Sequence, residues 1–232
     1  MKLITLNYRA FTTFGALCAA ALLGASTAKA AIVWDLNPSD QNASVGSNEH
    51  VFTSSGYQIT AAGYDNNNGI GTATDLFFKN QQDIGEARES GLGLTNAYQN
   101  ELFVGSHGPA DFIQLDLSKI LSQGFNSGSI SVASVQDGEG FQLFGSNTKG
   151  VLGTAISGPY TGVAFDDKFV AIPNFGTFKF ISIVATAGNV LPSAFAANIT
   201  PIPEMSTLMP IIGLVTAIGS TKLLRRRRAA LV

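Results

Sequence analysis

The chain of 232 residues has a formal net charge of −2, but this value conceals an acidic middle between two basic ends. Residues 31–203 contain 15 Asp and Glu against six Lys and Arg, a net charge of −9. Nucleic acids and anionic lipid surfaces are bound through cationic patches, so this balance argues against both as partners of the middle region, and we expect no nucleic acid partner. The single cysteine, Cys18, lies near the N-terminus, and the rest of the chain has no thiol for a disulfide.

The first thirty residues have the three-part pattern of a secretory signal peptide. A positive start at Lys2 and Arg9 precedes an uncharged apolar run over 11–23. Small residues then occupy the −3 and −1 positions that signal peptidase requires, so we expect cleavage to remove residues 1–30. The alternative is an uncleaved N-terminal anchor. The residues at the expected cleavage site are Ala28, Ala30 and Ala31.

Residues 31–200 have the pattern of one all-β domain, long enough to bury a single core. Apolar and polar residues alternate in segments such as 112–117 and 129–135, which is typical of strands with one buried face. Turn signals rich in Gly and Asn recur between these segments. We therefore predict a jelly-roll-like β-sandwich ectodomain. The expected strands are 32–36, 50–54, 57–61, 75–79, 101–104, 112–117, 129–135, 141–144, 151–156, 168–172, 178–187 and 194–199.

One short helix is expected within this domain, over 118–123. Ser118 is suited to the N-cap position, and Gly124 is suited to ending the helix.

The C-terminal segment, residues 201–232, has the pattern of a membrane anchor. Two prolines, Pro201 and Pro203, end the last expected strand. The apolar run 208–224 would span about 25 Å as a helix, slightly less than the roughly 30 Å of a hydrocarbon core. Four arginines at 225–228 orient it with the C-terminus in the cytoplasm and the ectodomain outside. We expect one transmembrane helix over 208–224, because the run lacks the polar face of a helix from a soluble domain.

This order of parts resembles the PEP-CTERM sorting signal of Gram-negative bacteria, in which a Pro-Glu-Pro-type motif precedes a transmembrane helix and an arginine-rich end. Pro203 and Glu204 match the first two motif positions, and Met205 replaces the second proline. The resemblance implies processing by exosortase, a membrane-embedded enzyme similar to cysteine proteases, in organisms that make exopolysaccharide. The residues of the signal are Pro203, Glu204, Met205, Arg225, Arg226, Arg227 and Arg228.

The resemblance also implies a location and extends to the ectodomain. The protein would be exported, anchored in the inner membrane with its ectodomain in the periplasm, and then moved to the cell surface or extracellular matrix. The middle region is similar to β-sandwich domains that precede such tails, and that similarity implies no activity. The segments that carry it are 91–94 with Glu101, 112–117, 134–147 and 180–190.

Catalytic residues are scarce in this chain. A base that titrates near neutrality would have to be His50, expected at the surface, or His107, expected in a loop. Neither histidine has the sequence context of a catalytic triad or a metal site. We therefore expect a non-catalytic protein. The alternative is a glycoside-active enzyme with two carboxylates about 5–10 Å apart, drawn from Glu86, Glu89, Glu101, Asp137 and Glu139.

The run Asp65-Asn66-Asn67-Asn68-Gly69 offers several oxygen ligands in an expected turn. Its glycine comes at position five, whereas an EF-hand loop needs glycine at position six. Asx-turn chemistry without a metal is the favoured interpretation, and we expect no cofactor. The alternative is a structural calcium ion, for which the candidate ligands are Asp65, Glu101 and Asp116.

Carbohydrate binding needs exposed aromatic rings beside amide or carboxylate groups. Tyr64 and Tyr98 lie in Asn-rich segments that are expected to be loops, whereas Trp34 lies in a strand and is expected in the core. The first interpretation is an exported, non-catalytic protein attached to the cell surface or matrix. The main alternative is a carbohydrate-binding module for exopolysaccharide, with Tyr64 and Tyr98 as sugar contacts.

Overall fold

The computed structural model describes residues 31–82, 88–95, 97–104 and 111–199. They belong to one compact unit, Ala30–Thr200. The described part of the chain is all-β, with strands in three antiparallel sheets and one short α-helix. The predicted signal peptide 1–30 and the predicted spanning helix 208–224 lie outside it. No helix within the described ranges is long and apolar enough to cross a membrane.

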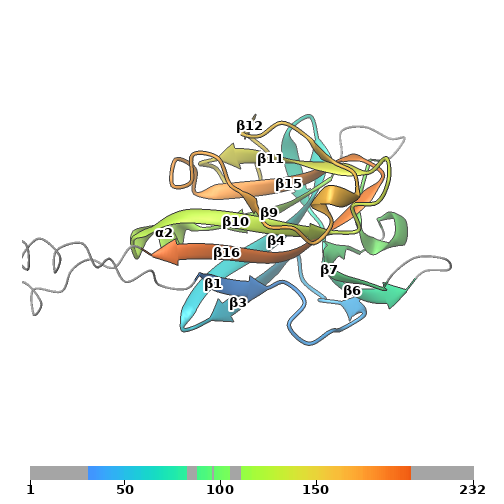
Figure 1. The fold of residues 1–232 in the computed structure, drawn as a ribbon, viewed down its shortest axis with the longest axis horizontal. Helices are drawn as coiled ribbons and strands as arrows, with labels where there is room; N and C mark the ends of the chain where they lie inside the picture. Colours follow the sequence, from blue (N-terminus) through green and yellow to red (C-terminus); the bar gives the residue numbers. More distant parts are fainter. Residues whose placement is uncertain (1–30, 83–87, 96, 105–110, 200–232) are drawn as a thin grey trace, which may run out of the picture. The chain divides into compact units, whose positions relative to one another are not determined.

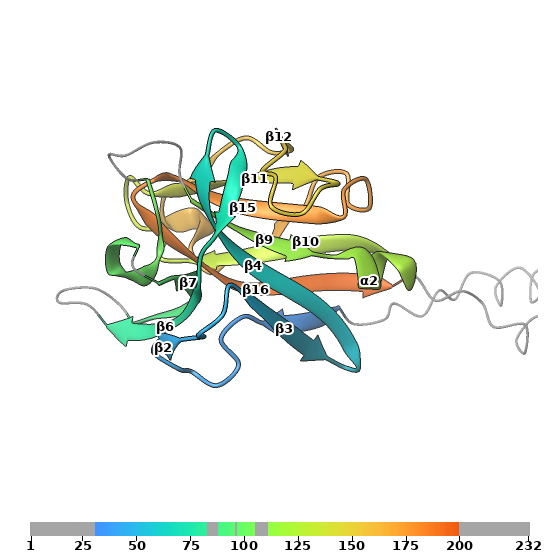
Figure 2. The same cartoon turned by 180° about the vertical axis from the view of Figure 1, so that it is seen from behind.

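The first sheet is built around the last strand of the domain. Its strands lie in the order β1 (Ile32–Asp35), β16 (Asn189–Ile199), β10 (Phe125–Ala133) and β14 (Val170–Ala171), and β8 (Leu102–Phe103) pairs with the start of β16. In Figure 1, β10, β16 and β1 run side by side, and Figure 2 shows the same layer from behind.

The second sheet faces the first. Its strands lie in the order β12 (Thr154–Ala155), β11 (Gly140–Ser146), β15 (Phe180–Ala187), β9 (Phe112–Asp116), β4 (Tyr57–Asn67) and β3 (Glu49–Ser54); β13 (Tyr160–Thr161) pairs with β11, and β5 (Ile70–Ala73) pairs with β4. The third sheet contains β2 (Ala43–Ser44), β6 (Leu76–Gln82) and β7 (Arg88–Leu94). This layered arrangement is sandwich-like, as predicted.

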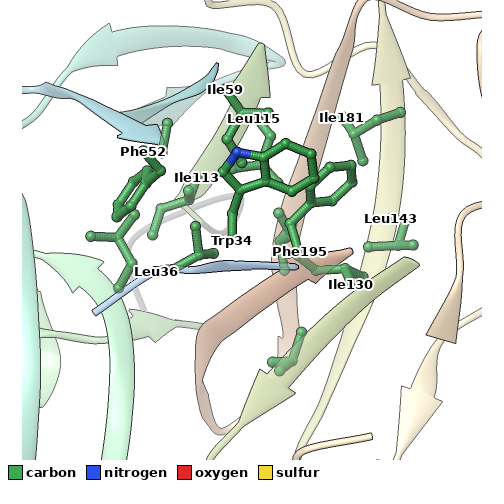
Figure 3. Close-up of a cluster of buried hydrophobic side chains, with 14 of the residues drawn as sticks. Trp34, Leu36, Phe52, Ile59, Ile113, Leu115, Ile130, Leu143, Ile181 and Phe195 are labelled. Carbon is green, nitrogen blue, oxygen red and sulfur yellow. The ribbon is translucent and has the colours of Figure 1, made fainter. Parts of the chain in front are cut away.

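The core lies between the sheets and is centred on Trp34. The indole of Trp34 is 1% exposed and contacts the rings of Phe125 and Phe195, with centroids 6.0 and 5.3 Å away. Its Nε1 donates a hydrogen bond to the backbone oxygen of Tyr57 at 3.1 Å. Figure 3 shows that the apolar side chains around Trp34 come from strands of both large sheets. The prediction that Trp34 belongs to the core is confirmed.

A smaller apolar cluster covers the outer face of the second sheet and includes Tyr64. Tyr64 lies in β4, is 5% exposed and stacks on Phe112 with ring centroids 5.0 Å apart. The amide of Gln114 donates to the oxygen of Val151 at 3.0 Å and accepts from the nitrogen of Gly150 at 2.9 Å, so the 150–151 segment is held over this face. The expectation of a loop at Tyr64 is therefore wrong, and its buried ring offers no face to a sugar.

Local details also differ from the sequence expectations. Strand β4 runs through Asp65, and its turn is confined to Asn68 and Gly69, both with positive φ (52° and 88°). The helix α2 (Ser118–Ser122) begins at Ser118 but has Leu117 at its N-cap. The carboxylate of Asp116 accepts a hydrogen bond from the backbone nitrogen of Ser118 at 2.9 Å. Asp116 therefore satisfies a free N–H group at the start of the helix, the role that was expected of the Ser118 side chain.

Candidate functional site: a buried lysine network beside an exposed tyrosine turn

Three charged side chains are buried together where the third sheet packs against the first. They are Lys79 from β6, Glu89 from β7 and Glu101, with exposed fractions of 1%, 7% and 0%. The Nζ of Lys79 donates to both carboxylates and lies 3.3 Å from Oε2 of Glu89. Charged groups are rarely buried to this extent unless they are paired, so the three form one electrostatic unit.

The strand register explains why the charges meet. In the β6–β7 pair Lys79 is opposite Gly91, and Gln81 is opposite Glu89, so Lys79 and Glu89 are diagonal neighbours on one face. Gly91 also permits close packing on the first sheet, because an added Cβ would lie 2.8 Å from the backbone oxygen of Pro192. Close contact of β7 with β16 therefore excludes water from the ion pair between Lys79 and Glu89.

Amide side chains extend the network toward the surface. The Nδ2 of Asn189 donates to Oε2 of Glu101 at 2.8 Å and to Oε1 of Gln99 at 3.0 Å. The Nε2 of Gln136 donates to Oε1 of Glu89 at 3.0 Å. The backbone nitrogens of Gln136 and Asn189 both donate to Glu139, at 2.8 and 3.3 Å. The network thus joins all three sheets through the turn between β10 and β11.

Three of the five carboxylates considered for glycoside chemistry belong to this network. Glu89 and Glu101 share Lys79, and Glu139 is bound to backbone nitrogens. Asp137 is exposed in the turn, and Glu86 lies outside the described residues. The burial of Glu89 and Glu101 and their pairing with one lysine suit a structural network better than two acids flanking a substrate.

Burial raises the pKa of Glu101 from 4.5 to about 7. Desolvation is the largest cause, and the negative charge of Glu89 raises the pKa further. The hydrogen bonds and charge of Lys79, together with the hydrogen bond from Asn189, act in the opposite direction. Glu101 therefore exchanges its proton near neutral pH inside the folded domain.

This shift predicts a pH-dependent stability. Because folded Glu101 holds its proton more tightly than unfolded Glu101, its contribution is complete below pH 4.5 and is lost as the pH rises through about 7. We expect the urea midpoint of the wild type, relative to Glu101→Gln, to fall between pH 5 and pH 8. The comparison with Glu101→Gln is needed because burial lowers the pKa of His50, which gives the opposite slope. If the urea midpoints of the wild type and Glu101→Gln differed by the same amount from pH 5 to pH 8, the raised pKa of Glu101 would be contradicted.

An exposed aromatic turn lies next to the network. The 3-10 turn η1 (Tyr98–Asn100) carries Tyr98, which is 57% exposed and contacts the ring of Phe103 with centroids 4.9 Å apart. Gln99 and Asn100 both have left-handed backbone angles, with φ of 54° and 57°, which non-glycine residues adopt rarely. Burial of Glu101 directly after the turn holds this conformation in place.

Gly93 allows the turn to pack on β7, and replacing it should be damaging. A Cβ at Gly93 would lie 1.8 Å from the backbone oxygen of Asn100. We expect Gly93→Ala to lower the free energy of unfolding by about 1–3 kcal/mol, because backbone must move to relieve the overlap. Gly158→Ala is the control, since an added Cβ there meets no atom within 4 Å. Urea unfolding curves with equal midpoints for the two variants would refute this packing.

The candidate calcium ligands are not gathered in one place. Glu101 belongs to the buried network, and Asp116 holds the start of α2. Asp65 is exposed in β4 and follows Tyr64, which pairs with Phe112 at the start of β9. Asp116 lies at the other end of β9, so the two aspartates are far apart on the sheet. Among the residues that the structure describes, no three His, Cys, Asp or Glu side chains are grouped to hold a metal ion.

His50 lies in β3 and is half-buried rather than fully at the surface. Its ring contacts Phe52 and Phe78 edge-on, with centroids 4.7 and 5.2 Å away. Ala31 is the first described residue of the chain and is exposed. The other predicted site residues lie outside the described ranges: His107, Ala28, Ala30, Pro203, Glu204, Met205, Arg225, Arg226, Arg227 and Arg228.

Sequence reasoning selected Glu89, Glu101 and Glu139 but missed Lys79 and Asn189. Lys79 directly follows Leu76-Phe77-Phe78, and this apolar context was the available signal that the lysine is buried. Comparison of the chain with protein-family models, with curated proteins and with solved structures gives no match.

Proposed function

We propose that this chain is an exported, non-catalytic protein of the cell surface or extracellular matrix that is sorted through its C-terminal segment. The observation that carries the proposal is the order of the tail: Pro203-Glu204, the apolar run 208–224 and the arginines at 225–228. Signal peptidase removes residues 1–30, the helix holds the chain in the inner membrane, and an exosortase-like enzyme processes the tail. The domain that is delivered is a jelly-roll-like β-sandwich.

Two features of the described domain support a role without catalysis. The buried carboxylates Glu89 and Glu101 are occupied by Lys79, and His50 packs against aromatic rings. The surplus of acidic residues in 31–203 also suits a soluble domain that stays away from anionic membranes and nucleic acids.

Relocation of the protein tests the sorting proposal. We expect the full chain to reach the cell surface or medium, and a variant with Pro203→Ala and Glu204→Ala to remain with the inner membrane. A matched variant with Ser206→Ala and Thr207→Ala should be sorted like the wild type, because these two residues follow the motif and do not belong to it. Identical distributions of all three proteins after cell fractionation would overturn the proposal.

A second candidate function is binding of a polysaccharide at the Tyr98 turn. Tyr98 presents an exposed ring supported by Phe103, and the amides of Gln99 and Asn189 are bonded to each other beside it. Aromatic faces flanked by amides can stack on sugar rings and bind their hydroxyl groups. Of the two tyrosines that the sequence suggested as sugar contacts, this site includes Tyr98 and leaves out Tyr64, whose ring is buried.

Retention on the exopolysaccharide of the producing organism tests this second candidate. We expect Tyr98→Ala to weaken retention about tenfold, the effect of losing roughly 1.4 kcal/mol of binding free energy. Phe169→Ala is the control, because Phe169 is similarly exposed (50%) and lies elsewhere on the domain. Failure of the wild-type protein to be retained, or equal weakening by both substitutions, would contradict sugar binding by this turn.

A further inference from the structure

The side chains of Lys79, Glu101 and Asn189 are arranged for a reaction within the chain. One oxygen of the Glu101 carboxylate accepts from Nζ of Lys79, and the other accepts from Nδ2 of Asn189 at 2.8 Å. An amine and a carboxamide are therefore held against the same carboxylate. Lys79 and Glu101 are 1% and 0% exposed, so water does not compete for either group.

We propose that Lys79 and Asn189 join through an amide bond between Nζ and Cγ, with Glu101 as the proton carrier. This inference goes beyond the proposed function and does not depend on how the protein is sorted. Lysine is a nucleophile only when its amine is neutral, and a buried carboxylate in contact with the ammonium group can take the proton.

The reaction balances without any other reactant. Glu101 takes a proton from the ammonium group of Lys79, and the free Nζ attacks Cγ of Asn189 to form the new C–N bond. The Cγ–Nδ2 bond then breaks as Glu101 delivers the proton to the departing nitrogen, while the second Nζ proton also leaves with it. The products are a secondary amide, an ammonium ion and the regenerated carboxylate. The pKa of Glu101, raised to about 7, suits a group that takes and returns a proton at neutral pH.

The fold positions the partners and gives the bond a structural purpose. Lys79 lies in β6 of the third sheet, whereas Asn189 begins β16 of the first sheet and pairs with Phe103. A bond between them would close a loop of about 110 residues, which stabilises a domain chiefly by restricting its unfolded chain. The region that is exported has no cysteine, so a lysine–asparagine bond would serve where a disulfide cannot.

Peptide mass mapping of the purified full chain tests the bond. Trypsin does not cut after an acylated lysine, so we expect the fragment that ends at Arg88 to retain Lys79 and to remain joined to the fragment that begins at Phe180. The joined species should be lighter than its two parts by about 17 Da, the mass of ammonia. Separate fragments of unmodified mass, with cleavage after Lys79, would overturn the proposal. A loss of about 18 Da would also overturn it, since it indicates a bond from lysine to a carboxylate.

Variants identify the partner and the proton carrier. We expect no joined species from Asn189→Ala or from Glu101→Gln, whereas the control Asn198→Ala, an exposed residue on the same strand, should give it in full. Joined fragments in Asn189→Ala would contradict the assignment. The wild-type mass alone decides whether the bond exists, so the test holds even if a variant does not fold.

Discussion

Replacing Lys79 by methionine is expected to lower the free energy of unfolding by about 3–5 kcal/mol, one of the two largest losses that a single substitution should cause in this domain. Before the proposed bond to Asn189 forms, the lysine is the cation that faces both Glu89 and Glu101 in a site that is almost completely buried, and the substitution removes that bond as well. Without it, the Glu89 carboxylate loses its cation, and the pKa of Glu101 rises further, so that Glu101 must take up a proton to stay buried. Urea unfolding at pH 7 followed by circular dichroism measures the loss.

An exposed ion pair serves as the control, because it shows how much stability is lost when a paired lysine that is not buried is replaced. Lys149 pairs with Glu49 at 2.7 Å, but both side chains are exposed, at 47% and 39%. We expect Lys149→Met to lower the free energy of unfolding by less than about 1 kcal/mol, because water screens an exposed pair. The double variant Lys79→Met with Glu101→Gln should recover part of the stability lost in Lys79→Met, since glutamine is neutral without taking up a proton. Equal small losses for Lys79→Met and Lys149→Met would contradict the account of the network.

Trp34→Ala is expected to have an effect of similar size, about 3–5 kcal/mol, because it removes the largest side chain of the core. Trp34 is 1% exposed between Phe125 and Phe195, and its Nε1 satisfies the backbone oxygen of Tyr57. The substitution loses apolar burial, leaves a cavity between the two sheets and removes this hydrogen bond. Since Trp34 is the sole tryptophan, circular dichroism rather than tryptophan fluorescence must follow the unfolding.

The adjacent residue provides the control for Trp34. Val33 lies in the same strand but points to the opposite face and is 45% exposed. Val33→Ala should change the free energy of unfolding by about 0.5 kcal/mol or less, as is usual at the surface. If the two substitutions destabilised the domain equally, Trp34 would not be the centre of its core.

Part of the fold could be predicted from the sequence because several segments alternate apolar and polar residues in the manner of strands. Alternating apolar residues identified β9 and β10, and strand β1 was placed within one residue of its observed end. The strand β7 was missed because its sequence, Arg-Glu-Ser-Gly-Leu-Gly-Leu, contains two glycines and two charges. Those glycines are explained only by tertiary packing: Gly91 lies against Pro192, and Gly93 lies against Asn100.

The candidate sites were less predictable, because their members meet only after the sheets have packed. Lys79, Glu101 and Asn189 are far apart in the sequence, and no local pattern links them. Tyr64 shows a related difficulty: its Asn-rich surroundings indicated a loop, but pairing with β9 and β5 extends β4 through this region and buries the ring. Tyr98, in a turn with similar composition, is exposed.

The proposed cross-link and the proposed destination support one another on physical grounds. A domain that leaves the cell loses the protection of chaperones and meets proteases that attack transiently unfolded chains. A buried network that joins three sheets, closed by one covalent bond, would reduce the population of such open states. The acidic surface would keep the released domain soluble.

The masses of the mature protein recovered from the producing cells test the central claim most directly. The account predicts a chain that begins at Ala31 and ends near Pro203, because signal peptidase and an exosortase-like enzyme have each removed one end. Recovery of the protein with residues 1–30 and 204–232 still attached would contradict both export and sorting through the tail.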